Sequence, residues 1–583
     1  MFIADFADFI NTYAKKYRPK LVFLVLSTTI AGCFEFAGLS LIWAFVLLLT
    51  KNSSNIAFFH NTNQTQTALF LGILVAGIYI LKDIFMIIHI NFQNRLLEDI
   101  INNIFKKIYS GFISQNYLTI RNIPPSDKLK ILDTSLNYVV NDFVGGVLML
   151  FANSIVALGI ISYLFIKFNS TAIIIAAFIF TVWFFENRYF KSRSKVLGDA
   201  MQAAERNKAD FTLSTLNAQK DIIIYNKRKI FSDEAQKLQK IFSKQRRKIR
   251  TNLQIPTFVT EIGVMAAFVL FVVLMLLNNR TNAELGAGLA ALAAIILRIT
   301  PNINKIQNCF QLINATKAEL KWFNEVTSKF YVKTATFRDT DEKFPFKNLV
   351  ELENVTFCYE KNKPVLKNID LKINKNEFIG ITGPSGSGKT TLFNLLCALF
   401  EPNSGKVKID GVILNPNMVK MWQNNISILS QDYALPFKTI GQNVTLEPNF
   451  DINKDKKDII EALKFANIYD EIQGDIEKNV NELSCGQRHR IALARVFYFK
   501  RNVIMLDEAT SALDVQTEDE ISKTVEAIKG KKTIIAIAHR LKTLKNCDRL
   551  IYMDNGKILG VGTFKELEDK FPEFKKLIKL SQF

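Results

Sequence analysis

The stretch of this sequence best suited to chemistry is GPSGSGKTT at 383–391, which directly follows the apolar run EFIGIT at 377–382. Its spacing is G-x-x-x-x-G-K-[ST], in which glycines let backbone N–H groups surround phosphate oxygens at the start of a helix. Lys389 supplies a cation for the β- and γ-phosphates, and Thr390 supplies a hydroxyl ligand for Mg²⁺. The apolar run TLFNLLCALF that follows favours a phosphate cradle over a plain glycine-rich turn. The predicted cradle consists of Gly383, Pro384, Ser385, Gly386, Ser387, Gly388, Lys389, Thr390 and Thr391.

Acidic residues and a histidine follow two further apolar runs. NVIMLD at 502–507 ends in Asp507 and is followed by Glu508. A carboxylate at the end of a strand beside a phosphate cradle lies where Mg²⁺ needs it, so we assign Asp507 to the metal and Glu508 to the attacking water. TIIAIAH at 533–539 ends in His539. A lone histidine is usually structural, but one at the end of a neighbouring strand can contact the γ-phosphate, so Glu508 and His539 are the predicted catalytic residues.

The octapeptide LSCGQRHR at 483–490 admits three interpretations: a cysteine nucleophile, a metal site, or a helix start that faces an anion. Cys485 as a nucleophile would need a nearby base and a substrate pocket. A metal would need further ligands, and none is near in the sequence. The apolar run IALARVFYF that follows at 491–499 favours the helix start.

The elements that position these residues belong to a chain of 583 residues, which is too long for one core. Long apolar runs fill residues 1–325, a polar linker is predicted at 326–346, and 347–583 has the pattern of a soluble α/β domain. The six cysteines lie without paired spacing, which argues against a disulfide framework and a zinc module.

The net charge of +20 is compatible with either a nucleic-acid-binding protein or a membrane protein. Cations crowd the segment 188–255, whereas the short segments 51–66 and 279–283 hold one each. This asymmetry follows the rule that positive loops stay on the cytoplasmic side of a membrane. We therefore expect a membrane protein and no nucleic-acid partner.

Six apolar segments are long enough to span a bilayer. Residues 1–18 have helical apolar spacing and are predicted to lie in the cytoplasmic interface, with both chain ends cytoplasmic. The long connections 95–138 and 188–255 are predicted to be helices that extend beyond the bilayer, with tips near 120–130 and 216–227. The predicted spans are 20–50, 67–94, 139–167, 170–187, 256–278 and 284–307.

Charged residues inside such spans are costly and are usually paired or functional. Arg298, which precedes Pro301, is a candidate to line a substrate cavity and contact an anionic group such as a phosphate. Lys82 is a second candidate, with local pairing or snorkelling to the interface as its alternative.

The order of these motifs resembles that of an ABC-transporter ATPase, and six spans ahead of one such domain resemble a type IV exporter half-transporter. The resemblance covers nearly the whole chain. It implies ATP and Mg²⁺ as cofactors, ATP hydrolysis coupled to transport, and a homodimer, because the family closes ATP between two ATPase domains. The motifs are the phosphate cradle at 383–390, LSCGQ at 483–487, Asp507, SALD at 511–514 and His539.

The resemblance also implies roles for single residues. Tyr359 resembles the aromatic residue that stacks on adenine, Gln431 the glutamine that meets Mg²⁺ and senses the membrane domain, and Asp514 the D-loop aspartate. The two tips resemble coupling helices. The signature residues, which would touch ATP held by the other subunit, are Ser484, Cys485, Gly486 and Gln487.

The signature departs from the family form LSGGQ, because Cys485 replaces its first glycine. Cysteine keeps the backbone N–H, so the replacement is expected to be tolerated if φ is negative there. The preceding segment GDIEKNVNE at 474–482 also lacks the glycine-rich run usual in the family.

Three stretches resemble the lipid-linked oligosaccharide flippases of the PglK type: CFEFAGLSLIWAF, AIILRITPNINKIQ and AQKDIIIYNK. This resemblance implies a polyprenyl-pyrophosphate glycan as substrate and a bacterial inner membrane as location. One departure is the short polar segment NSSNIAFFHNTNQTQT at 52–67, where those flippases have an amphipathic helix. The alternatives are a general lipid or multidrug exporter of the same fold and an ATP-gated regulator or channel.

Overall fold

The computed structural model describes residues 2–50, 64–277, 282–329, 331, 342–360, 363–507, 515–537 and 545–580. Some or all of the side chains in 43–50, 64–65, 163–191, 271–298, 515–518 and 577–580 fall outside this description. The chain divides into two compact units. Unit 1 comprises Met1–Gln115 and Thr119–Thr336, and unit 2 comprises Asn116–Leu118 and Phe337–Phe583. The division after Thr336 falls inside the predicted linker 326–346.

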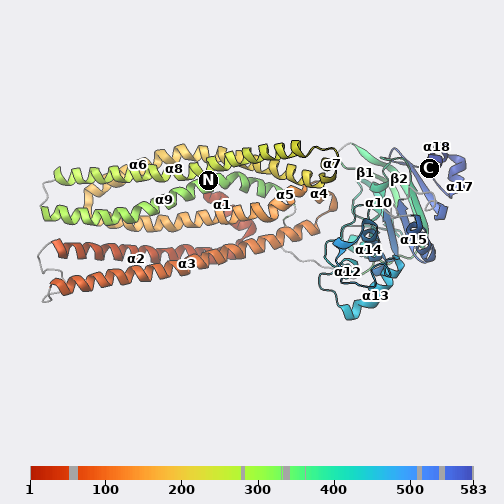
Figure 1. Cartoon of the computed structure of the whole chain (residues 1–583), viewed down its shortest axis with the longest axis horizontal. Helices are drawn as coiled ribbons and strands as arrows, with labels where there is room; N and C mark the ends of the chain where they lie inside the picture. Colours follow the sequence, from red (N-terminus) through yellow and green to blue (C-terminus); the bar gives the residue numbers. More distant parts are fainter. Residues whose placement is uncertain are drawn as a thin grey trace. The chain divides into compact units, whose positions relative to one another are not determined.

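Unit 1 consists of helices, and its long members α2, α3, α6, α8 and α9 run side by side (Figure 1). Two short segments, η2 and η3, have the wider π-helical turn. The helices are α1 (Phe2–Tyr13), η1 (Lys15–Tyr17), α2 (Arg18–Thr50), α3 (Gln64–Ser114), α4 (Tyr117–Arg121), α5 (Pro125–Lys130), η2 (Ile131–Ser135), η3 (Tyr138–Val144), α6 (Gly145–Asn217), α7 (Gln219–Ile224), α8 (Arg228–Leu277) and α9 (Asn282–Thr327).

The described helices include four segments that are long and apolar enough to cross a membrane: Lys15–Ile42, Gln66–Ser114, Pro125–Ser162 and Arg228–Leu270. They overlap four of the six predicted spans. The other two, 170–187 and 284–307, lie in α6 and α9, where many side chains fall outside the described residues, so these two spans stay predictions.

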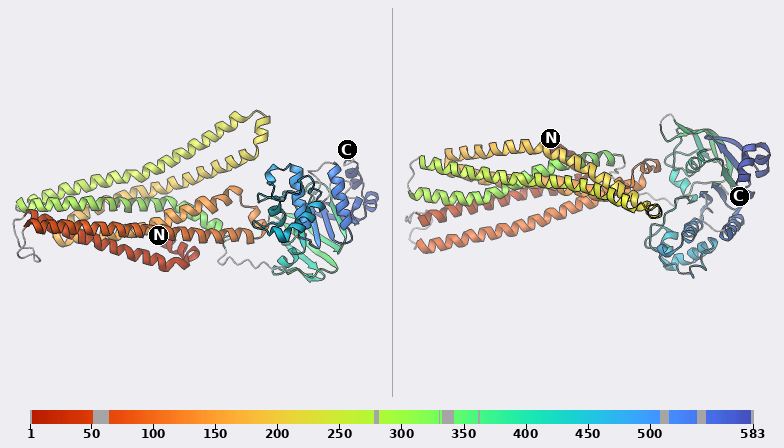
Figure 2. Two further views of the ribbon diagram at one scale, coloured as in Figure 1. Left: turned by 60° about the horizontal axis from the view of Figure 1, so that its bottom comes forward. Right: turned by 45° about the horizontal axis from the view of Figure 1, so that its top comes forward.

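The two long connections 95–138 and 188–255 are largely helical, as the sequence predicted. In Figure 2, α6 and α8 meet at the short α7, which occupies the second predicted tip. The first tip contains α4 and the start of α5, where Pro124 takes an extended conformation before the helix begins. Proline removes a backbone donor and restricts the residue before it, which explains why the helix is interrupted at this point.

The predicted N-terminal helix forms as α1, but its apolar face packs on protein. Phe9, Ile10 and Tyr13 are buried, and the Tyr13 hydroxyl lies 2.7 Å from Thr327 Oγ1 at the end of α9. Phe9 also contacts Phe323 of α9, with ring centroids 6.5 Å apart. These residues are therefore covered by α9, and the placement of α1 in the cytoplasmic interface stays a prediction.

Unit 2 contains two sheets with helices around them (Figure 1). The smaller sheet is antiparallel in the order β2-β1-β4-β5, and the larger sheet has the order β10-β9-β3-β8-β7-β6. The strands are β1 (Leu349–Cys358), β2 (Pro364–Asn374), β3 (Phe378–Thr382), β4 (Ser404–Ile409), β5 (Val412–Ile413), β6 (Ile426–Leu429), β7 (Val503–Asp507), β8 (Thr533–Ile537), β9 (Arg549–Asp554) and β10 (Lys557–Gly562).

The strands β9, β3, β8, β7 and β6 are parallel, and β3, β7 and β8 are buried along their whole length. Apolar residues on both faces of a strand are typical of a parallel sheet that is covered on both sides. The helices of unit 2 are α10 (Lys389–Leu396), α11 (Val419–Gln423), α12 (Ile440–Thr445), α13 (Ile452–Phe465), η4 (Val480–Glu482), α14 (Cys485–Tyr498), α15 (Val515–Ile528), α17 (Phe564–Lys570) and α18 (Pro572–Leu580).

Candidate nucleotide site

The predicted phosphate cradle lies between β3 and α10, as a P-loop requires. Gly383 has φ of +149°, and a Cβ there would lie 2.1 Å from the Met553 carbonyl oxygen, so only glycine fits. Gly388 is the N-cap of α10 with φ of +101°. The loop therefore presents the backbone N–H groups at the start of α10, where the helix dipole favours an anion.

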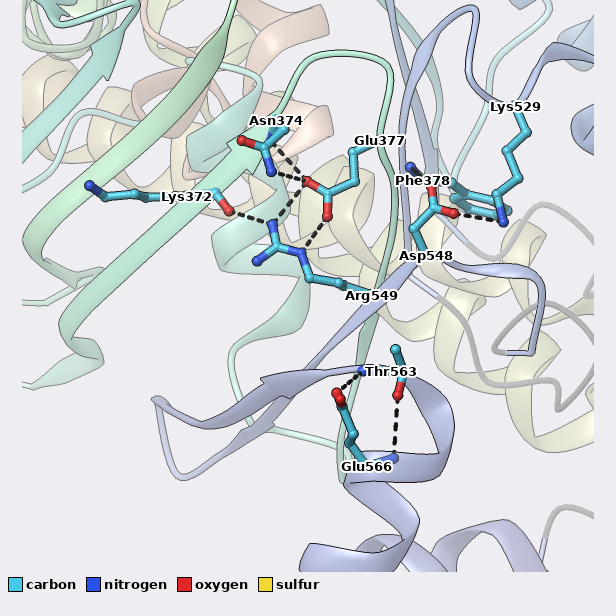
Figure 3. Close-up of polar contacts among 9 residues, drawn as sticks. All are labelled: Lys372, Asn374, Glu377, Phe378, Lys529, Asp548, Arg549, Thr563 and Glu566. Atoms are coloured by element: carbon cyan, nitrogen blue, oxygen red, sulfur yellow. Dashed lines mark hydrogen bonds and ion pairs between the residues drawn. The ribbon is translucent and has the colours of Figure 1, made fainter.

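Polar contacts fix the strand that leads into the cradle (Figure 3). Glu377 accepts hydrogen bonds from Arg549 Nε and, at 2.9 Å, from Arg549 Nη2. Asp548 accepts the backbone N–H of Phe378 at 2.9 Å and pairs with Lys529 at 2.8 Å. These contacts tie the amino-terminal end of β3 to the start of β9. The register of the two strands then places Met553 beside Gly383.

Two side chains in the cradle are prepared for phosphate. Lys389 Nζ donates to the carbonyl oxygens of Gly383 and Pro384, at 2.9 and 2.8 Å, so its ammonium lies across the loop. Ser387 Oγ is buried and has no hydrogen-bond partner among the described residues. An unpaired buried hydroxyl is costly, and a phosphate oxygen or a water at the loop would satisfy it. The residues present thus fit a nucleotide phosphate.

Tyr359 lies next to this loop, just beyond β1. Its hydroxyl is 3.0 Å from Thr391 Oγ1 on α10, and its ring meets Phe357 and Phe400 edge-on. Tyr359 is 38% exposed, so it remains accessible to a stacking partner. This placement supports the predicted adenine contact, which stays a prediction.

The acidic residue predicted to hold Mg²⁺ lies at the same edge of the sheet. Asp507 ends β7 and is buried, and β8 lies between β7 and β3 with all three strands parallel. Gln431 follows the end of β6, which pairs with β7.

Burial raises the pKa of the Cys397 thiol at the end of α10, and the nearby Asp507 carboxylate raises it further.

Three predicted residues lie outside the described residues: Glu508, Asp514 and His539. The structure describes the strands that lead to two of them. Asp507 precedes Glu508 directly, and β8 ends at Ile537, two residues before His539. The neighbouring parallel strands expected from the sequence are present, and the catalytic roles stay predictions.

The signature segment forms the start of α14. Ser484 is its N-cap: Ser484 Oγ accepts the Gln487 N–H at 3.2 Å, and Gln487 Oε1 accepts the Ser484 N–H at 3.0 Å. This reciprocal pair is a capping box, which fixes the helix start. Cys485 is exposed, has no positive φ and is the first residue of the helix, so its backbone does not require glycine. A negative φ at Cys485 was the condition for tolerating a cysteine in place of glycine, and the structure meets it.

Two residues that the sequence did not single out hold this helix start. Glu471 accepts two hydrogen bonds from the buried guanidinium of Arg490, and Gln487 Nε2 donates to it at 3.1 Å. The Tyr433 hydroxyl donates to the Cys485 carbonyl at 3.3 Å, and its ring packs edge-on against His489. Tyr433 follows the predicted site residue Gln431 by two positions, and this proximity could have identified it as part of the site. Nothing in the sequence near Glu471 indicated a contact with α14.

The two candidate cavity residues in the apolar spans, Lys82 and Arg298, have different outcomes in the structure. Lys82 of α3 forms an ion pair with the buried Glu35 of α2. This contact favours the local-pairing alternative for Lys82 over an anion-binding role. Arg298 belongs to α9, but its side chain lies outside the described residues, so its role stays a prediction.

Comparison with known proteins assigns a family to part of unit 2. Residues 366–511 match the protein family described as ABC transporter. The chain is 38% identical over 229 residues to the ATP-dependent lipid A-core flippase of Ralstonia nicotianae (38% of this chain, 39% of the relative). It is 35% identical over 240 residues to the putative multidrug export ATP-binding/permease protein YgaD of Bacillus subtilis (40% and 41%). It is 32% identical over 265 residues to the beta-(1-->2)glucan export ATP-binding/permease protein NdvA of Agrobacterium vitis (43% and 45%).

Each of these matches spans less than half of the relative's length. The fold comparison is broader. A solved structure of a bacterial Atm1-family ABC exporter with ATP bound has a TM-score of 0.82, covering 98% of this chain and 99% of that chain at 16% identity. The chain therefore joins an ABC transporter ATPase domain to a domain of apolar helices, in the fold of an Atm1-family ABC exporter.

Proposed function

We propose that this protein is an ATP-driven exporter that works by alternating access. The observation that carries the proposal is the cradle at Gly383–Thr391 with Asp507 at the same sheet edge, in a chain with an exporter fold. Binding and hydrolysis of ATP would favour different arrangements of the helices, which is how a ligand shifts a conformational equilibrium.

The nucleotide would be held mainly by this chain's own groups. The loop N–H groups and Lys389 hold the phosphates, Tyr359 covers the base, and Glu508 polarises the attacking water. Thr390, Gln431 and Asp507 would hold Mg²⁺, which when bound neutralises charge that develops on the phosphates. His539 contacts the γ-phosphate.

The working form in this proposal is a homodimer in a bacterial inner membrane, with the ATPase domain in the cytoplasm. The chain has one cradle and one signature helix, and each ATP would lie between the cradle of one subunit and the signature helix of the other. The exposed helix start at Ser484–Gln487 supports this arrangement, because its first N–H groups and dipole suit an anion supplied from outside the subunit.

We further propose a lipid-linked oligosaccharide or polysaccharide precursor as the substrate. The support is the resemblance of three stretches to lipid-linked oligosaccharide flippases, and Arg298 as a cation suited to a pyrophosphate. A relative named as a lipid A-core flippase and one named as a glucan exporter are compatible with a glycolipid. A relative named as a putative multidrug exporter supports the alternative, a general lipid or multidrug exporter.

The test is transport by the purified protein in liposomes. Fluorescent polyprenyl-pyrophosphate glycan, fluorescent phospholipid and a hydrophobic dye are offered separately, each with MgATP or without it. We expect MgATP-dependent movement of the glycan lipid, which Lys389→Ala abolishes. Equal movement of the dye and the phospholipid would refute the glycan assignment and favour the multidrug alternative.

A further inference from the structure

A largely buried polar cluster at the first tip joins α5 and η2 to α6 and α9. We call it the tip clamp, and it includes two ion pairs. Arg206 of α6 pairs with the buried Asp127 of α5 at 2.6 Å, and Lys130 of α5 pairs with the buried Glu319 of α9 at 3.2 Å. Its members are Ser126, Asp127, Lys130 and Ser135 on α5 and η2, Arg206 and Asp210 on α6, and Glu319 on α9.

Glu319 is the centre of the tip clamp because both of its carboxylate oxygens are used. One oxygen accepts from Lys130, the last residue of α5, and the other accepts from the fully buried Ser135 hydroxyl, the last residue of η2. The Lys130 ammonium also lies 4.8 Å from the Trp322 ring centroid, one turn further along α9. A single side chain of α9 therefore fixes both ends of η2.

The start of α5 is held by α6. Ser126 donates to Asp210, and Asp127 accepts from Arg206 one helical turn earlier on the same face of α6. Glu205 lies beside the clamp: burial raises its pKa, Glu319 raises it further, and Lys130 lowers it. Charged groups thus attach α5 and η2 to two long helices, α6 and α9.

Buried ion pairs are a poor way to add stability, because desolvation offsets most of their attraction. Their best-attested use is to fix one register among alternatives. The segments next to the clamp suit such a role, because η2 and η3 are π-helical, and π-turns are frequently found at functional sites.

We infer that Glu319 and Lys130 are positioning residues that transmit displacement of the first tip to α9, and that through them ATP binding alters α9. The inference rests on the proposed function. Asn116–Leu118 group with unit 2. From there the chain continues through the short α4 into α5. Because Glu319 fixes η2 to α9, α5 and α9 would shift together.

The test compares hydrogen–deuterium exchange of the full-length protein in lipid nanodiscs with and without MgATP. Peptides covering 383–396 report nucleotide binding, and peptides covering 312–327 report the response of α9. The main variant is the double replacement Lys130→Met/Glu319→Gln, which removes both buried charges together and leaves no unpaired ion. Glu325→Gln is the matched control, because Glu325 pairs with Lys321 at 3.8 Å on the exposed side of the same helix.

We expect MgATP to protect 383–396 in every protein and to change exchange at 312–327 in the wild type and in Glu325→Gln. In the double variant, protection at 383–396 should persist while the change at 312–327 falls at least fivefold. A change of wild-type size at 312–327 in the double variant, with 383–396 protected, would overturn the clamp alone. Absence of protection at 383–396 in the wild type would overturn the proposed function and this inference with it.

Discussion

The anchoring of the signature helix by Glu471 gives a sharp prediction. Glu471→Ala removes the two carboxylate oxygens that accept from the Arg490 guanidinium, and with them the acceptor of Gln487 Nε2. The Arg490 side chain is 7% exposed, so the charge left behind remains in a poorly solvated place, with the Asn467 carbonyl at 2.7 Å as a remaining partner. We therefore expect Glu471→Ala to lower the free energy of unfolding of unit 2 and to loosen the start of α14.

The magnitude follows from the exposure of the two partners. Removing one partner of a fully buried ion pair costs about 3–5 kcal/mol. Glu471 is 44% exposed and Arg490 keeps one acceptor, which lowers the expected loss to about 2 kcal/mol. For a unit of this size, that corresponds to a fall in melting temperature of about 4–8 °C.

The matched control is Glu461→Ala. Glu461 has a similar exposure, 49%, but its partner Lys500 is 55% exposed and also pairs with Asp458. Removing it should cost at most about 0.5 kcal/mol, as is usual for surface pairs. The assay is thermal unfolding of the full-length protein, followed by intrinsic fluorescence, together with the ATPase rate. Equal shifts of the two variants would refute the argument that the buried guanidinium sets the cost.

Three further predictions concern the nucleotide site. Glu508→Gln should bind ATP in a fluorescent-nucleotide assay but nearly abolish turnover, and a wild-type hydrolysis rate would remove Glu508 as the group that polarises water. Cys485→Gly should keep or raise the ATPase rate, because the cysteine has no positive φ, whereas Gly486→Asp should nearly abolish it by placing a carboxylate where the γ-phosphate is expected; an inactive Cys485→Gly would show that the thiol has a role of its own. Gly383→Ala should lose ATP binding, because its Cβ would lie 2.1 Å from the Met553 oxygen, and unchanged affinity for labelled ATP would contradict the loop geometry.

The sequence was sufficient for much of the ATPase domain. Glycine spacing and fully apolar runs predicted β3, the cradle, α10, β7 and β8, because these features depend on local backbone geometry and on burial on both faces. The negative φ required at Cys485 could be stated in advance as a condition, and the structure meets it.

Other features depend on contacts distant in the sequence. The sequence gives no sign that Glu471 would meet Arg490, or that Glu319 would meet Lys130, since 189 positions separate the latter two. Lys82 could be recognised as a costly charge, but only the packing of α2 on α3 identified Glu35 as its partner. Helical spacing predicted α1 correctly, yet spacing does not tell whether an apolar face meets lipid or another helix.

The central claim is that each ATP lies between two copies of this chain, and native Cys485 allows a direct test. Ser385→Cys adds a thiol to the exposed part of the cradle, opposite the expected position of the partner's signature helix. Membranes are treated with a mild oxidant, with and without MgATP, and resolved by non-reducing electrophoresis. The account predicts a disulfide-linked dimer that increases with MgATP and disappears when Cys485→Ser is added. A chain that remains monomeric under oxidation, or a dimer that forms equally without Cys485, would contradict it.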